Sequence, residues 1–195
     1  MSRRNQRLSH IFTVVCLALA AAPARATTVI PLSFDEIVTQ AGAIALVETV
    51  RVRSDWKTSP RGKHIVTHVT FRVDRVIKGQ AGPTFELELL GGNIGGLVMD
   101  VEGMPQFRVG DRDGLFLSSI PNSASPIVGL FQGRFRLEGD RGAGTERVLT
   151  HNGKPFVAAS AGARRFVLSN PAAPARALSY PEFESLVAQT LAQSR

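Results

Sequence analysis

Alternation of apolar and polar residues in the middle of the chain, with Val66 and Thr67 as exceptions, restricts the fold more than any other feature. The stretch "HIVTHVTFRVDRVIKG" at 64–79 and the stretch "TFELELL" at 84–90 both show it. The residues of one parity are Ile65, Val69, Phe71 and Val73 in the first stretch, and Phe85, Leu87 and Leu89 in the second. A period of two is typical of a strand with one buried face, and such strands belong to antiparallel sheets.

Further segments fit the same reading. "AIALVETVRVR" at 43–53 predicts a strand with Ile44, Leu46, Val50 and Val52 on one face, although Glu48 interrupts it and indicates a bulge or a strand end. We expect a polar turn or loop at 54–62 and strands at 115–117 and 127–139. A hairpin is expected within 146–157, around Asn152-Gly153.

Helix signals stand near both ends of this β-rich region. Ser33 with Glu36, and Ser179 with Glu182, are capping-box patterns, and each predicts the start of a helix. The expected fold is therefore mainly β: a small antiparallel β-barrel or sandwich with an extra β-hairpin and short helices at both ends. The expected division is a β domain at 27–169, followed at 170–195 by a Pro/Ala linker and a C-terminal helix.

A glycine-rich stretch, "GGNIGGLVMDVEGMPQF" at 91–107, raises the question of phosphate binding. A phosphate loop needs a helix N-terminus behind it and commonly a Gly-Lys-Ser/Thr sequence, and neither follows here. The stretch predicts a bend, since glycine permits a close approach of backbones and a positive φ. It remains open whether this loop also forms a binding rim.

The first 26 residues predict a signal peptide. Arg3, Arg4 and Arg7 precede an apolar run at 11–22, and Ala24-Arg25-Ala26 offers a cleavage site that leaves Thr27 first. The run is shorter than the ~20 residues of a membrane-spanning helix, so no transmembrane span is expected in the mature chain. We expect export, to the periplasm or beyond it.

Residue types also limit the chemistry. The only cysteine, Cys16, lies in the predicted signal peptide, so thiolate metal sites and disulfides are excluded from the mature chain. His64 and His68 would be ~13 Å apart on a strand, too far for one ion. No catalytic set assembles, and the sequence predicts a non-enzymatic protein without metal or cofactor.

Basic residues gather in the two strands around the predicted turn. Between Arg51 and Lys78 there are eight basic residues and two acids. The candidate ligand-binding residues here are Arg51, Arg53, Trp56, Lys57, Lys63 and Arg72. A basic face with an aromatic tip suits nucleic acid, an anionic polysaccharide or an acidic protein, and export favours the last two; a solvated face is the alternative.

The segments "QAGAI" at 40–44, "RVIKG" at 75–79 and "VGDRDGLFL" at 109–117 resemble the netrin-like module of tissue inhibitors of metalloproteinases. Bacterial secreted proteins with this pattern are also similar. The resemblance implies an OB-type barrel whose free N-terminus binds a protease's catalytic zinc. Thr27, Thr28 and Pro31 stand in the corresponding places, without the family's two cysteines.

The sequence therefore predicts an exported, non-catalytic binding module. Its partner is an extracytoplasmic protein, a metalloprotease included, or an anionic polysaccharide. Two alternatives remain beside it: an inhibitor acting through Thr27 and Thr28, and a hydrolase whose catalytic residues the sequence does not reveal.

Overall fold

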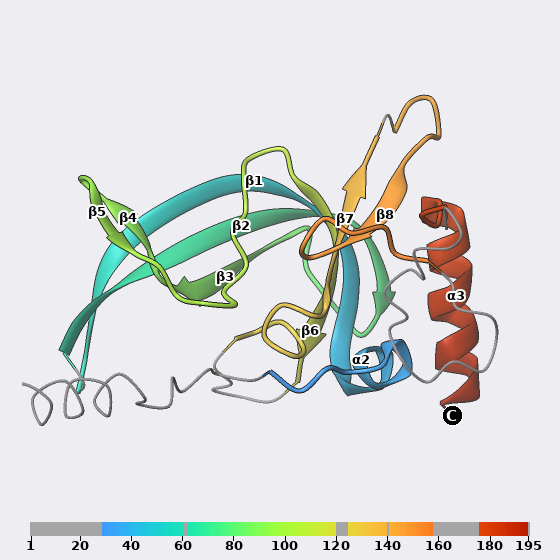
Figure 1. Cartoon of the computed structure of the whole chain (residues 1–195), viewed down its shortest axis with the longest axis horizontal. Helices are drawn as coiled ribbons and strands as arrows, with labels where there is room; N and C mark the ends of the chain where they lie inside the picture. Colours follow the sequence, from blue (N-terminus) through green and yellow to red (C-terminus); the bar gives the residue numbers. More distant parts are fainter. Residues whose placement is uncertain (1–28, 61, 120–124, 140, 158–175, 195) are drawn as a thin grey trace, which may run out of the picture.

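The computed structural model describes residues 29–60, 62–119, 125–139, 141–157 and 176–194 (Figure 1). The predicted signal peptide, Thr27 and Thr28 lie outside the described residues, as does 158–175, which includes the start of the predicted linker. Export and cleavage near Ala26 therefore stay predictions.

The architecture is mainly β, as predicted. The strands are β1 (Ala41–Ser59), β2 (Gly62–Lys78), β3 (Thr84–Leu90), β4 (Gly92–Ile94), β5 (Leu97–Met99), β6 (Arg112–Ser118), β7 (Arg134–Glu138) and β8 (Arg147–Thr150). Six of them form an antiparallel sheet in the order β3-β2-β1-β6-β7-β8, and β4 pairs with β5. Among the described residues β3 and β8 do not pair with each other, so this sheet is open and the predicted OB-type barrel is not confirmed.

Two hydrophobic cores lie on opposite faces of the sheet. On one face pack α2 (Phe34–Gln40) and α3 (Tyr180–Gln193), with Phe183 and Val187 of α3 buried beside Phe116 and Phe135. This helix-side core is rich in edge-to-face phenylalanine contacts. The second core, on the other face, includes Val69, Phe71 and Phe107.

Strand β1 serves both cores in its first half. Ile44 and Leu46 belong to the helix-side core, whereas Ala45 and Val47 belong to the second. Its register with β2 shifts between Thr49 and Arg51, as the interruption at Glu48 suggested. Such a bulge exchanges the faces of all later residues. The prediction that Val50 and Val52 share a face with Ile44 and Leu46 was therefore wrong: Val52 pairs with Val69 of the second core, and Val50 is exposed.

The predicted loop at 54–62 was also wrong over most of its length. Ser54 to Ser59 continue β1 and pair in register with β2 as far as Gly62. The polar composition misled the prediction, because here neither face is fully covered. The distal parts of β1 and β2 curve away from the helices together with β3, β4 and β5 (Figure 1). We call this projection the arm.

The structure also bears on the predicted strand at 127–139 and on the predicted hairpin around Asn152-Gly153. The predicted strand at 127–139 is shorter, since β7 begins only at Arg134 and turns precede it, with Leu130 at φ +69°. The hairpin around Asn152-Gly153 is confirmed by a bridge between Leu149 and Pro155 and by a hydrogen bond from Thr150 N to Lys154 O (2.8 Å).

The glycine-rich stretch bends, as predicted, and forms a small hairpin. Gly95 and Gly96 link β4 to β5 with φ of +59° and +86°, the combination that a tight two-residue turn requires. Gly92 lies so close to the hydroxyls of Ser54 and Thr67 that a Cβ there would collide with both. Glycine thus lets the hairpin lie directly on the arm.

Both predicted capping boxes are present. Ser33 N donates to Glu36 Oε2 (2.7 Å), and Ser179 N donates to Glu182 Oε2 (2.7 Å). Hydrogen bonds from the Ser179 hydroxyl and backbone, together with Arg176, lower the pKa of Glu182 to about 2. The caps fix where α2 and α3 begin against the sheet.

We predict that Glu182→Gln removes part of the acid sensitivity of folding. A carboxylate whose folded-state pKa is depressed contributes stability that is present above its unfolded value near 4.5 and is lost as pH falls toward about 2. Urea unfolding from pH 6 to pH 2 should show wild type more stable at the upper end, and the difference should vanish near pH 2. Glu102→Gln, at an exposed site, is the control, and a constant difference would contradict the prediction.

Candidate functional site

The structure separates the predicted basic residues onto two faces of the arm. In the register of β1 with β2, Arg51, Arg53, Lys57 and Arg72 share the outer face. The same face carries four acids, namely Glu48, Asp55, Glu86 and Glu88.

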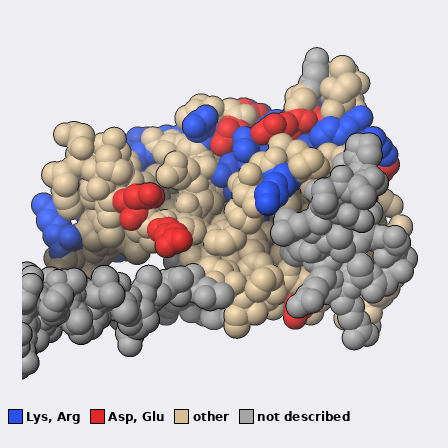
Figure 2. Space-filling view, in the orientation of Figure 1, with Lys and Arg blue, Asp and Glu red and all other residues tan. Residues whose placement is uncertain are grey.

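These opposite charges pair with each other. Lys57 Nζ lies 2.5 Å from Glu88 Oε1, Arg72 pairs with Glu48 at 2.5 Å, and Arg53 pairs with Asp55. On the face that Figure 2 shows, basic and acidic side chains lie next to each other along the upper part of the molecule. By count the outer face is neutral, so the feature that suggested polyanion binding is weaker in three dimensions than along the sequence.

Trp56 and Lys63 lie on the opposite, inner face of the arm. Trp56 pairs with Ile65, which is buried, and the Lys63 ammonium lies 4.7 Å from the Trp56 ring centroid. The Trp56 side chain is nevertheless 43% exposed. Trp56 is therefore not the tip of a basic face but part of the arm's inner surface.

A groove of about 440 Å³ lies in this inner surface. Its lining is mainly apolar: Val52, Val69, Leu89, Val98, Met99, Met104 and Phe107 are among the residues that form it. Ser54 and Thr67 supply a polar centre, where their hydroxyls lie 3.1 Å apart and Thr67 donates to Gly91 O (2.7 Å). We call this site the inner groove.

The hairpin β4–β5 adds exposed apolar side chains to the same region. Leu97 is 62% exposed and Val98 64% exposed, and Asn93 N holds the hairpin to the Ser54 hydroxyl (3.3 Å). Large apolar side chains that stay in contact with water beside a groove are typical of interaction surfaces. Methionines at such a site let it adapt to different partners. The sequence left open whether this loop forms a binding rim, and it did not show that Val98 of the hairpin lines the groove together with Val52.

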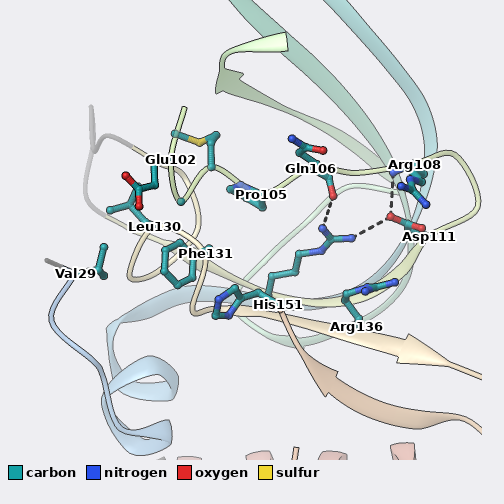
Figure 3. Close-up of a pocket in the computed structure, with 13 residues that line it drawn as sticks. Val29, Glu102, Pro105, Gln106, Arg108, Asp111, Leu130, Phe131, Arg136 and His151 are labelled. Atoms are coloured by element: carbon teal, nitrogen blue, oxygen red, sulfur yellow. Dashed lines mark hydrogen bonds and ion pairs between the residues drawn. The ribbon is translucent and has the colours of Figure 1, made fainter. Parts of the chain in front are cut away.

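A second cavity, of about 680 Å³, lies between the turns before β6 and β7 (Figure 3). Arg108, Arg136, His151 and Phe131 line it, and the rings of Phe131 and His151 stack at 4.1 Å. Burial, with the nearby charge of Arg134 as the smaller cause, lowers the pKa of His151. The shift favours the neutral form of this imidazole.

Arg134 closes the floor of this cavity. It donates from Nε to Asp113 Oδ1 (2.7 Å), from Nη2 to Asp111 Oδ2 (3.0 Å) and from Nη1 to the carbonyl of Gln106 (2.5 Å), and it lies over the Phe107 ring. Burial raises the pKa of Asp113, an effect that Arg134 opposes. Since these bonds occupy Arg134, we assign it to the structure of the protein rather than to a ligand.

The N-terminal segment is anchored next to this cavity. Gln132 accepts from Leu32 N (2.8 Å) and donates to Ile30 O (3.0 Å), as a neighbouring strand would. Val29 lines the cavity, and Thr27 and Thr28 precede it outside the described residues.

The described part of the chain offers few side-chain groups for metal binding or acid–base catalysis. No three His, Cys, Asp or Glu residues gather there to hold a metal ion. His68 Nδ1 lies 2.9 Å from Glu86 Oε1 on the outer face, and neither residue lines the inner groove or the cavity beside His151. None of the helices in that part is long and apolar enough to cross a membrane.

Comparison of the chain with models of protein families, with curated proteins and with solved structures gives no match. Function must therefore be inferred from the geometry above.

We predict that Arg134→Met costs about 3–5 kcal/mol of unfolding free energy, because it leaves Asp113 buried without its ion-pair partner. The double variant Arg134→Met/Asp113→Leu should recover part of that loss. Arg136→Met, which breaks a half-exposed pair with Glu138, should cost no more than about 1 kcal/mol. Urea unfolding measures all three, and equal losses for Arg134→Met and Arg136→Met would contradict the assignment.

Proposed function

We propose that the protein is an exported, non-catalytic binding module that holds a partner polypeptide on the inner surface of its arm. The observation that carries the proposal is a set of exposed apolar residues on the arm: Val98 lines the inner groove, Leu97 precedes it in β5, and Trp56 lies on the inner face of β1. A few residues carry most of the binding free energy at a protein interface, and tryptophan is enriched among them.

The composition of the groove supports a protein partner over a small polar substrate. Its polar centre is a pair of hydroxyls, whereas no acid, histidine and nucleophile converge on it. Asp100 lines the groove, but a lone carboxylate is not an acid–base pair. Neither a cofactor nor a metal is part of the proposal.

Removing the apolar anchors should abolish partner capture. We predict that mature protein, immobilised through its C-terminus, retains one extracytoplasmic protein that Trp56→Ala/Val98→Ala retains at least about tenfold more weakly. Val109→Ala, a change at another exposed apolar residue outside both cavities, should capture like wild type. Capture is quantified by mass spectrometry, and equal retention by all three proteins would refute the proposal.

A specific observation also favours the inhibitor alternative. In the netrin-like inhibitors disulfides fix the N-terminal segment, and here the two hydrogen bonds of Gln132 hold Ile30 and Leu32 in place. An N-terminal segment that is already fixed loses less conformational freedom on binding. The two hydrogen bonds therefore favour a mechanism in which Thr27 and Thr28 bind a protease.

This alternative makes a distinct prediction. Protein that begins at Thr27 should inhibit a metalloprotease from the same compartment. One additional residue before Thr27 should abolish inhibition, because it converts the amine of Thr27, the expected metal ligand, into an amide. Gln132→Ala should weaken inhibition, whereas Trp56→Ala/Val98→Ala should not. Peptide-cleavage assays decide it, and inhibition that is insensitive to the extra residue would rule the mechanism out.

The polyanion alternative retains Arg51, Arg53, Lys57, Lys63 and Arg72 as its candidates. Their ion pairs and their division between two faces give it less support than the apolar groove gives to a protein partner. Binding of an anionic polysaccharide that falls steeply with salt would restore it.

A further inference from the structure

Strand β1 changes from an interior strand to an edge strand at Thr49. Up to Glu48 it pairs with β6, and at Thr49 the N–H donates to Asp111 O (2.8 Å) while the C=O accepts from Gly110 N (2.8 Å). From Arg51 to Thr58 it pairs with β2 on one side, and no backbone group in the described ranges bonds to its other side. Among the described residues, the arm therefore has eight residues of open strand edge.

The direction of the free backbone groups follows from the ladder. Gly91 N donates to Ile65 O (2.8 Å), so the odd-numbered residues of β2 in this part direct their polar groups toward β3 and the even-numbered ones toward β1. On β1 the partners of the even-numbered residues are Arg51, Arg53, Asp55 and Lys57. The N–H and C=O groups of Val52, Ser54, Trp56 and Thr58 consequently point to the open edge.

Side chains along this edge alternate between two chemistries. Arg51, Arg53 and Lys57 project from the outer face with Asp55 as the only acid among them, whereas Val52, Ser54 and Trp56 project from the inner face. The acids Glu86 and Glu88 that balance the outer face belong to β3, on the far side of β2. At the β1 edge itself the charge is positive.

We propose that an extended segment of the partner polypeptide adds to the β1 edge as a further strand, with acidic side chains next to Arg51, Arg53 and Lys57 and apolar side chains next to Val52 and Trp56. The inference rests on the proposed function and specifies its partner. Strand addition draws affinity from main-chain hydrogen bonds and specificity from alternate side chains. The apolar side chains of the added strand face the inner groove.

Part of the charge on this edge disfavours pairing with a second copy. Basic side chains on an edge strand discourage pairing with a like edge. If two copies paired antiparallel about Ser54, Arg51 of one copy would lie opposite Lys57 of the other, whereas Arg53 would lie opposite Asp55. An acidic strand turns that repulsion into attraction, and within the fold Lys57 already reaches across β2 to Glu88 in this way.

Trp56 makes the edge directly observable, because it is the only tryptophan in the chain. The probe is a blocked synthetic peptide, Glu-Val-Glu-Val-Thr-Val-Glu, added to mature protein at low salt. We expect a saturable change in Trp56 emission. A peptide with lysine in place of each glutamate should bind at least about tenfold more weakly.

Two variants separate strand addition from general apolar binding. Val52→Pro removes an edge-facing N–H and no bond to β2, so it should weaken the acidic peptide at least about tenfold more than Val52→Thr, which changes the side chain but keeps the N–H. Arg51→Glu/Arg53→Glu should reverse the preference in favour of the lysine peptide. Thermal unfolding of each variant verifies that it is folded.

Three results would overturn the inference: equal binding of both peptides, binding unchanged in Val52→Pro, or no emission change at about 1 mM peptide. Concentration-dependent self-association in sedimentation that Val52→Pro abolishes would also overturn it, because the occupant would then be a second copy. If partner capture still depends on Trp56 and Val98 but the acidic peptide does not bind, strand addition at the β1 edge is refuted and the proposed function is not. Loss of both would refute the proposed function as well.

Discussion

The bulge between Thr49 and Arg51 is the constraint on which the arrangement of the molecule depends. Before it, β1 is buried on both faces and joins two hydrophobic cores. After the bulge, the register of β1 with β2 has shifted, and β1 no longer pairs with β6. The rest of β1 therefore has one open edge. The first half of β1 thus belongs to the core of the protein and the second half to the projecting arm. The position of the arm is therefore set by the packing of β1 in the core.

This arrangement explains why the arm can expose apolar side chains without destabilising the fold. The free energy of folding comes largely from the phenylalanine-rich helix-side core and from the second core under β1 and β2. Beyond Val52 the arm contributes its backbone ladder and few fully buried groups. Its inner surface is therefore free to carry Trp56, Leu97 and Val98 for recognition, which a strand in the core could not do.

Local patterns in the sequence predicted the β-rich class, the strands β2 and β3, both capping boxes and the hairpin at Asn152, because each depends on neighbouring residues. Features that depend on distant partners were missed. Nothing local shows that Ser54 to Ser59 pair with β2, or that the acids of β3 face the basic residues of β1. The sequence could place eight basic residues near each other, but only the register shows which share a face.

The same distinction bears on the candidate site. Trp56 stood out in the sequence as the aromatic residue of a basic segment. The sequence did not show that it shares the inner face of β1 with Val52, or that Val98 of β5 lines a groove together with Val52. The glycines at 91–96 gain a reason in the structure, since a side chain at Gly92 would lift the β4–β5 hairpin off Ser54 and Thr67. They shape the groove by letting two backbones approach, which is a different use of glycine from the anion cradle that their spacing first raised.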